Sequence, residues 1–583
     1  MANIRWSSFV ATLGLVLVAC APAAAPAPAV PAPAAAPAAA PKAPAQPQAP
    51  APAAAAPAPA AAPAARPAEA PKVAAEDKPV RGGVIRYGNI RYAPHFETLT
   101  EGTNATQEAL SMISDKLVRV ALEPGGGYGD VKVVPQAAET WEVSPDAKTW
   151  TFRLRKGMKW ENKPPVNGRE VVAEDLIFMM ERGMFDPSSI FQSRYEQVKK
   201  FTAPDKYTLV VELKEPHCCF LNQMLQEPNF ILAPEIKKEG KDYRTFPISS
   251  GPMVSTKSEE GVIRSFRRRD DYWNAGQVHV DGLDYITIPD EKTISAALIA
   301  GQLHVAYGRD SSTNTGEAQR IIKANPSLAS SQKPAAGASG IWLKQGNPKF
   351  DDIRVRLAIS KAFNRQGMID KLYAGFGGIP TVNSPLHGKW ALPQEEIKKM
   401  DAFIYDPKRS KELLAEAGYP NGFEMTGIWW AQTGISQSRT EWIIRELEAI
   451  GIKLKLTGLP YQTALAKGFG GDFEDSYVGG TGDFFAPYDI LVFVYHSTGA
   501  RNGSVNIPAL DKKIEDVVTT IDEEARRQKL LATMRYIFTD VLYKIPHAAA
   551  ANISVWNPKL RNFKPAQGPY GIEQYIFGTW LGQ

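Results

Sequence analysis

A long segment made almost entirely of alanine and proline decides where this chain can fold. It spans residues 21–75 and contains few large apolar side chains, so it cannot bury enough surface to form a core. Repeated proline favours extended polyproline II conformation, which rises about 3.1 Å per residue. A segment of this length would reach on the order of 150 Å. The sequence therefore predicts a tether here, and confines the folded body to the residues that follow.

A short apolar run precedes the tether. Arg5 is the only charge before this run, which covers residues 9–19 and ends at Cys20. The run is shorter than the ~20 apolar residues that a membrane-spanning helix needs. A basic start followed by a short apolar segment is typical of a secretory signal. We therefore predict a signal peptide over residues 1–19.

The end of the run resembles the lipobox of bacterial lipoproteins. Its residues read Leu17-Val18-Ala19-Cys20, and in that family the signal is cut before the cysteine, which carries the lipid. The resemblance implies lipid attachment at Cys20 and a tether over residues 20–78. The alternative is an ordinary signal peptide with an incidental cysteine.

The body, residues 79–583, is long enough for two to four domains. The formal net charge is +5, and the most basic cluster, residues 267–269, is followed at once by Asp270 and Asp271. Nucleic acid is therefore not an expected partner. Cys218 and Cys219 are adjacent, a spacing that rarely allows disulfide geometry. We favour two buried thiols over a vicinal disulfide.

The sequence lacks the short motifs that carry common chemistry. It has no Gly-x-Ser-x-Gly, His-Glu-x-x-His, Walker Gly-x-x-x-x-Gly-Lys or Cys-x-x-Cys, and its seven histidines are scattered. Catalytic triads are spatial rather than sequential, so a secreted enzyme on the same scaffold remains a rival interpretation. We expect no catalytic residues, no cofactor and no metal.

Strand and helix patterns alternate along the body. Residues 148–157 place Trp150, Phe152 and Leu154 on one side, as a half-buried strand would. Asp351-Asp352 can cap a helix from residue 353 to about 363, and Asp406-Pro407 can start another that ends near residue 418. Alternation of this kind predicts α/β layers.

Several segments then resemble the extracellular solute-binding proteins, family 5, which include the oligopeptide-, dipeptide- and nickel-binding components of ABC importers. The matching segments occur in the family's order, and they are residues 135–157, 171–178, Gly251-Pro252, Tyr272-Trp273-Asn274, 294–301 and 350–359. The sequence departs from the family pattern at Met253, at Asn364-Arg365 and in residues 163–168. These departures weaken any transfer of one subfamily's ligand.

The resemblance implies an α/β fold of the periplasmic-binding-protein kind (type II, with an extra domain). Two lobes joined by two crossing hinge segments would enclose the ligand and close over it. Lobe one would hold residues 79–123, 246–338 and 546–583. The extra domain would hold residues 124–245, and lobe two residues 339–545.

The resemblance also implies candidate ligand residues. Asp483 lies in the Gly-rich segment 479–489, where peptide-binding members present an aspartate to the α-amino group of the peptide. The alternative is that Asp483 only caps its own turn. Tyr488 follows in the same segment, and Trp429 and Trp430 offer broad aromatic contact area. Adjacent strand residues face opposite ways, so at most one of the two tryptophans should contact ligand, and core packing is the simpler explanation for both.

These residues predict a monomeric extracytoplasmic protein, held to the membrane by its lipid anchor. It would capture a small solute, most simply a peptide, and deliver it to the membrane permease of an ABC importer. A glycan-binding or metal-chelate-binding member of the same fold is the alternative. Residues 486–489 resemble the metal-chelate subfamily, and His496 is the nearby candidate ligand.

Overall fold

The computed structural model describes residues 78–582, with several gaps. The gaps are residues 101–103, 122–131, 218–219, 225–228, 307–314, 336–337, 432–434, 482–483, 485, 504, 564 and 566–575. The described residues belong to one compact unit, Pro71–Gln583. The predictions for Cys20, Cys218 and Cys219 lie outside the described residues.

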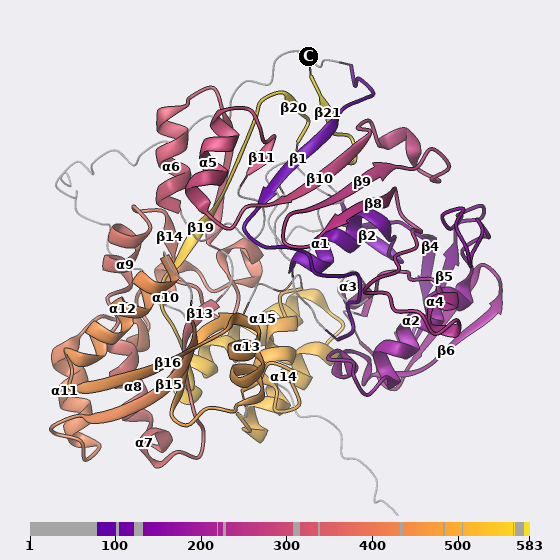
Figure 1. Cartoon of the computed structure of the whole chain (residues 1–583). Helices are drawn as coiled ribbons and strands as arrows, with labels where there is room; N and C mark the ends of the chain where they lie inside the picture. The colour runs from indigo at the N-terminus through magenta and orange to yellow at the C-terminus, as the bar shows by residue number, and fades with distance from the viewer. Residues whose placement is uncertain are drawn as a thin grey trace, which may run out of the picture. The chain divides into compact units, whose positions relative to one another are not determined.

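An eight-stranded sheet forms the core of what we call lobe one. Its path is β12 (Ala329–Ala335), β19 (Ala549–Trp556), β11 (Val305–Ala306), β1 (Val84–Asn89), β10 (Gly282–Thr287), β9 (Ile263–Arg268) and β8 (Met253–Glu259), and β14 (Gly377–Gly378) pairs with β19. β1, β10, β9 and β8 lie side by side in Figure 1. Helices α1 (Asn104–Ile113), α5 (Glu291–Ile299) and α6 (Thr315–Ala324) accompany this sheet, with α5 packed on β11 and α6 on β19.

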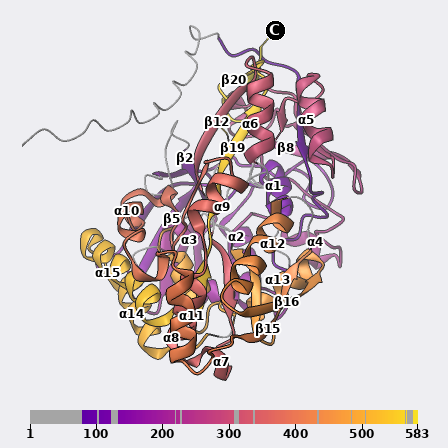
Figure 2. The ribbon, with the colours of Figure 1, turned by 90° about the vertical axis from the view of Figure 1, so that its left-hand side faces the viewer.

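A five-stranded sheet forms the core of lobe two. Its order is β16 (Ile452–Leu459), β15 (Phe423–Trp430), β17 (Ser476–Thr481), β13 (Ala338–Leu343) and β18 (Lys544–Pro546). The helices of this lobe are α7 (Pro348–Asp351), α8 (Ile353–Lys361), α9 (Arg365–Leu372), α10 (Gln394–Ile397), α11 (Pro407–Glu416), α12 (Ile435–Glu448), α13 (Tyr461–Gly470), α14 (Pro508–Thr519) and α15 (Glu523–Tyr536). Figure 2 shows α8 and α11 side by side.

Two paired segments connect the two sheets, and β14, which lies between β13 and β15 in sequence, also reaches the lobe-one sheet by pairing with β19. The chain leaves lobe one at the end of β12, enters lobe two as β13, and returns from β18 to β19. The two passages are neighbours, because β12 pairs antiparallel with β19 and β13 pairs antiparallel with β18. Gly340 lies opposite Pro546 in the second of these ladders. These are the two crossing segments that the sequence predicts.

A separate four-stranded antiparallel sheet, with the order β4-β5-β7-β6, lies in the part of the chain predicted to form the extra domain. Its strands are β4 (Ala138–Val143), β5 (Thr149–Leu154), β7 (Thr208–Leu213) and β6 (Val198–Asp205). The nearby helices are α2 (Ala173–Phe185), α3 (Phe220–Met224) and α4 (Pro234–Lys238). Two small ribbons pair β2 (Val118–Ala121) with β3 (Lys132–Pro135) and β20 (Leu560–Arg561) with β21 (Trp580–Leu581).

Short helical turns complete the description. They are η2 (Gln192–Tyr195), η3 (Ala275–Gln277), η4 (Pro385–Trp390), η5 (Asp401–Phe403), η6 (Leu491–Tyr495) and η7 (Ile537–Val541). Of these, η4 and η6 bear on the candidate site, because His387 of η4 contacts Phe484 and η6 lines a pocket together with Thr481.

Local sequence explains where several elements start and which way they face. The Asp352 carboxylate accepts a hydrogen bond from the Arg354 amide, and so caps α8. The Asp406 carboxylate caps α11, with Pro407 at its first position. Along β5, Trp150, Phe152 and Leu154 are buried while their neighbours are less so. These sequence predictions are confirmed.

Candidate functional site

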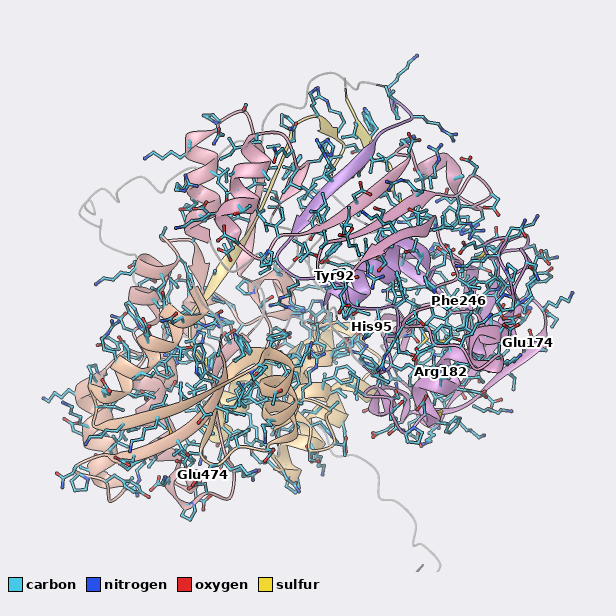
Figure 3. All side chains as sticks on the ribbon, viewed as in Figure 1. Tyr92, His95, Glu174, Arg182, Phe246 and Glu474 are labelled. Atoms are coloured by element: carbon cyan, nitrogen blue, oxygen red, sulfur yellow. The ribbon has the colours of Figure 1, made fainter. Side chains whose placement is uncertain are left out.

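The candidate site begins at the edge of the lobe-two sheet where β17 ends. β15 and β17 run parallel, with Trp429 opposite Val478, and β13 runs antiparallel to β17, with Ala338 opposite Thr481. In Figure 3, Glu474 marks the end of this sheet at which β17 begins. Ligands of open α/β sheets bind beyond the carboxyl ends of parallel strands. The expected binding edge is therefore the other end, at Thr481.

The turn after β17 carries the predicted ligand residue Asp483, which lies outside the described residues. Its neighbour Phe484 is described and buried, and the Nε2 atom of His387 in η4 lies 3.0 Å from the Phe484 carbonyl oxygen. Burial lowers the pKa of His387 to about 4, so the ring is neutral at pH 7. His387 therefore holds this turn from outside the strand.

Trp429 and Trp430 are both half-buried and pack against the apolar core of lobe two. The Trp430 ring lies 5.6 Å from the ring of Tyr461 and 6.5 Å from that of Tyr477. The guanidinium carbon of Arg439 lies 5.9 Å from the centroid of the Trp430 ring. These contacts account for the burial of Trp430 within lobe two, and ligand contact by either tryptophan stays a prediction.

Tyr488 and His496 both lie close to η6. Tyr488 is buried in the core of lobe two, and its carbonyl accepts a hydrogen bond from the Leu491 amide. The His496 Nδ1 atom lies 2.9 Å from the Thr498 hydroxyl, and Nε2 lies 3.5 Å from a Glu515 carboxylate oxygen. Within the described parts of the chain, no group of three His, Cys, Asp or Glu side chains is placed to hold a metal ion.

A pocket opens between β13, β17, β18 and η6, at the edge where the crossing segments meet lobe two. Its lining residues come from five separate stretches of sequence. They are Ser339, Gly340, Trp342, Thr381, Thr481, Ile490, Val494, Tyr495, Lys544, Ile545 and Pro546. Thr481 lies two residues before Asp483, so the pocket adjoins the turn that the sequence selects.

Lys544 is the charged residue of the pocket, and it is 5% exposed. Its Nζ atom donates to the Asn502 carbonyl at 2.6 Å. It also lies 4.8 Å from the centroid of the Trp342 ring and 5.1 Å from that of Tyr495. Burial lowers the pKa of Lys544 from 10.5 to about 7, because the charged form loses its hydration.

A second buried cation holds the crossing segment beside the pocket. The Arg365 guanidinium donates to the Pro546 carbonyl at 2.9 Å and to the carbonyl and hydroxyl of Ser360 at 3.1 and 2.9 Å. The Nδ1 atom of His547 lies 2.7 Å from the Ala548 carbonyl oxygen. Burial lowers the pKa of Arg365 to about 9 and that of His547 to about 3. These contacts pair the backbone carbonyls where the chain leaves lobe two.

Sequence reasoning missed Lys544, Thr481 and Ser339. One signal was present, because Lys544 is a single charge between Leu542-Tyr543 and Ile545-Pro546. A lone lysine inside an apolar strand is unusual. Its neighbours Thr481 and Ser339 could not be inferred, because both are more than 60 residues away in the sequence.

The fold and site define a two-lobed binding protein of the α/β class, and comparison with known proteins gives the family. Residues 132–502 match the model of the bacterial extracellular solute-binding proteins, family 5 Middle. The chain belongs to this family. Members are extracytoplasmic solute-binding proteins, and family membership thus confirms the class that the sequence predicts.

Individual relatives are distant but cover most of the chain. The chain is 26% identical over 483 residues to di/tripeptide-binding protein 1 of Pseudomonas aeruginosa, covering 77% of this chain and 86% of that protein. It is 25% identical over 478 residues to heme-binding protein A of Haemophilus influenzae, covering 77% and 84%. Both relatives are named as binding proteins and neither as an enzyme.

Structural similarity confirms the predicted fold class. The periplasmic binding protein DppA of Helicobacter pylori, solved in complex with the peptide STSA, superposes with a TM-score of 0.74 at 22% sequence identity. The similarity covers 86% of this chain and 99% of that one. At this identity the similarity shows the fold and leaves the ligand of this chain open.

Within residues 78–582 and outside their gaps, no helix combines the length and apolar character needed to cross a bilayer. The predicted lipid attachment site, Cys20, lies outside the described residues.

Proposed function

We propose that this chain is the substrate-binding component of an ABC importer, and that its solute is a peptide. One observation carries the proposal: the chain shares its fold, over 99% of the neighbour's length, with a binding protein solved with a peptide. The similarity to a di/tripeptide-binding protein supports the same solute class. In this proposal the protein releases its solute unchanged to a membrane permease, and is not an enzyme.

Closure of the two lobes would enclose the solute. The paired passages β12–β13 and β18–β19 connect the two sheets, and hinge closure about such passages is a known switching mode. The proposed boundaries are those predicted above, with lobe one at residues 79–123, 246–338 and 546–583, the extra domain at 124–245 and lobe two at 339–545.

Within the site, we assign Asp483 to the α-amino group of the peptide, with Trp429, Trp430 and Tyr488 as further candidate contacts. An ammonium group enclosed by the lobes needs a paired anion, and deleting one partner of a buried pair costs about 3–5 kcal/mol. Asp483→Ala should therefore weaken the binding of peptides with a free α-amino group by about 100- to 1000-fold. N-acetylated peptides should lose little further affinity in the variant, and additive effects of the two changes would count against this contact.

The amino-terminal segment would hold the mature protein at the membrane as a monomer. The proposal is that Cys20 carries a lipid and that residues 20–78 tether the body to it. Cys20→Ala should release the protein into the soluble fraction of cells and abolish metabolic lipid labelling. Unchanged membrane fractionation would contradict the anchor without affecting the binding proposal.

The solute class is tested by thermal unfolding and calorimetry with the peptide Ser-Thr-Ser-Ala and a panel of dipeptides. A ligand that binds only the folded state stabilises it by about 2.7 kcal/mol at a hundredfold excess over Kd. The peptide recovered after the assay should be intact by mass spectrometry. Cleaved peptide would identify an enzyme, and an unchanged melting temperature across the panel would reject peptides.

A metal chelate is the second candidate solute, because one relative that spans 77% of this chain is named a heme-binding protein. Hemin titration followed by its Soret absorbance distinguishes the two candidates. Stoichiometric, saturable spectral change without any response to peptides would favour the chelate.

A further inference from the structure

The pocket beside the turn that follows β17 contains a buried cation with spare hydrogen-bond donors. An ammonium group has three N–H donors and no acceptor. Within the described residues, Lys544 Nζ has one hydrogen-bond acceptor, the Asn502 carbonyl at 2.6 Å, and no carboxylate within 4.0 Å. Two donors therefore remain for a group that enters the pocket.

The rings beside Lys544 favour the cation only weakly compared with a paired anion. Trp342 and Tyr495 lie 4.8 and 5.1 Å from the ammonium, and such contacts are worth much less than a buried ion pair with good hydrogen bonds. A buried charge without a paired partner is costly. The pocket is thus built around a charge that its own described residues do not neutralise.

A second polar group in the same pocket also lacks a partner. The Thr481 hydroxyl is fully buried and makes no hydrogen bond with any described residue. Thr481 ends β17. Thr481 and Lys544 line one pocket, and a hydroxyl donor and an ammonium donor together match the acceptor oxygens of a carboxylate or phosphate.

Arg365 is a buried cation of lobe two with a structural role, and its hydrogen bonds can be compared with those of Lys544. Its guanidinium donates to Pro546 and Ser360 in three hydrogen bonds, and it is 3% exposed. Lys544 lies on β18, whose residue Pro546 accepts from Arg365, and it is similarly buried, yet among the described residues it makes one such bond. The difference indicates a ligand site at Lys544 rather than a second structural contact.

We propose that this pocket binds an oxyanion group of the captured solute, with Lys544 and Thr481 as its hydrogen-bond donors. The proposal rests on the solute-binding function proposed above and adds to it the charge of one end of the solute. A peptide would present its carboxyl terminus or an acidic side chain, and a phosphorylated solute would present its phosphate.

The test compares matched ligands on matched variants of the full-length protein. The ligands are Ser-Thr-Ser-Ala with a free carboxyl terminus, the same peptide as its carboxamide, sodium acetate and inorganic phosphate. The variants are Lys544→Met, Lys544→Arg, Thr481→Val and, as control, Lys512→Met on the exposed face of α14. Calorimetry gives the affinities, and thermal unfolding gives the stability of each variant without ligand.

The proposal predicts a specific pattern. Lys544→Met should weaken the carboxylate peptide about 100-fold and the carboxamide little, because one charge-assisted contact is lost. Thr481→Val should weaken the carboxylate peptide about tenfold, Lys544→Arg should keep the preference for it, and Lys512→Met should match the wild type. Without ligand, Lys544→Met should melt at a higher temperature than the wild type, because an unpaired buried cation is removed.

Several outcomes would overturn the proposal while leaving solute binding intact. One is a Lys544→Met protein that binds the carboxylate peptide as tightly as the wild type does. Another is a Lys544→Met protein that melts at a lower temperature without ligand, which would assign Lys544 a structural partner. If the wild type binds neither peptide, the peptide proposal fails, and the anion site is then tested with acetate and phosphate.

An increase in melting temperature caused by acetate or phosphate in the wild type but not in Lys544→Met supports the site. An equal increase in both proteins, or no increase in either, rejects it.

Discussion

Asp115 and Lys544 are both buried charged residues, but they differ in how many hydrogen-bond partners surround the charged group. Asp115, between α1 and β2, is fully buried and accepts hydrogen bonds from Gln136 at 2.7 Å, Tyr272 at 2.8 Å and Trp273 at 2.9 Å. Among the residues that the structure describes, Lys544 has one hydrogen-bond acceptor, and it lines a pocket. Burial moves both pKa values toward the neutral form, Asp115 to about 6 and Lys544 to about 7.

The comparison separates a structural buried charge from one that is placed for a ligand. The donors to Asp115 come from a strand connection and from the Tyr272-Trp273 pair, more than 130 residues apart in sequence, so the carboxylate joins distant parts of the chain. Lys544 joins no such set among the described residues. Satisfied hydrogen bonds mark the first kind of site, and a cavity with unused donors marks the second.

The largest effect should come from removing the structural charge. Asp115→Ala leaves three buried donors without an acceptor and should lower the free energy of unfolding by about 3–5 kcal/mol. Urea unfolding followed by circular dichroism measures this change. Asp270→Ala, at an exposed carboxylate, is the matched control and should cost less than about 1 kcal/mol. Equal losses in the two variants would remove the distinction drawn for Asp115.

The second-largest effect should be a pH dependence of stability that arises from the lowered pKa of Lys544. Its pKa in the folded protein, about 7, lies below its ordinary value of 10.5, so the unfolded chain binds more protons between these two values. Stability therefore rises with pH across this window and is unaffected by this group below it. From pH 7 to pH 9 the wild type should gain about 2 kcal/mol relative to Lys544→Met.

Other groups near Lys544 should not obscure that titration. Burial raises the pKa of Tyr495, the titratable side chain whose ring faces the ammonium, so it stays neutral throughout the window. Asp115, whose pKa is raised from 3.8 to about 6, titrates below it and with the opposite sign. Urea unfolding at each pH gives the difference, and a constant difference from pH 7 to pH 9 would contradict a depressed pKa of Lys544.

A smaller effect should follow from removing one donor around Asp115. Gln136→Ala deletes the hydrogen bond to the Asp115 carboxylate and the one that its Oε1 accepts from the Lys116 amide, and should cost about 1–2 kcal/mol, since Tyr272 and Trp273 still donate to Asp115. The pKa of Asp115 should rise further, because a hydrogen bond to its charged form is lost. Urea unfolding at pH 7 and pH 5 tests both statements. A larger loss at pH 5 than at pH 7 would show that Gln136 does not stabilise the charged form.

The smallest change in stability should come from Thr481→Val. The Thr481 hydroxyl is buried without a described hydrogen-bond partner, so its replacement by a methyl group should leave the free energy of unfolding unchanged or raise it by less than about 1 kcal/mol. A marked loss of stability in urea unfolding would show that the hydroxyl has a structural partner. Gln136→Ala and Thr481→Val thus test the comparison with one neutral polar group from each region.

Sequence patterns predict those parts of the fold that depend on neighbouring residues. The caps at Asp352 and Asp406 and the inward side of β5 are encoded within a few positions, and the family resemblance supplies the two lobes. The pocket is different, because Ser339, Thr481 and Lys544 meet only through the register of β13 with β17 and β18. No local pattern contains that register.

The candidate site was predictable to the same limited extent. The Gly-rich segment after β17 points to Asp483 through resemblance alone, whereas His387, which binds the carbonyl of Phe484, is almost 100 residues away in sequence. A single histidine without a motif gives no reason to connect it with that turn. Contacts between distant segments are the part of a binding site that composition and periodicity do not encode.

The place of β19 in lobe one has a consequence for the order in which the protein can fold. β19 begins at Ala549, near the end of the chain, yet it lies inside the sheet between β12 and β11. The sheet of lobe two, in contrast, uses strands from Ala338 to Pro546 only. Because synthesis runs from the amino terminus, the lobe that begins first is completed last. During synthesis, all strands of the lobe-two sheet are therefore available before β19, which the lobe-one sheet still needs.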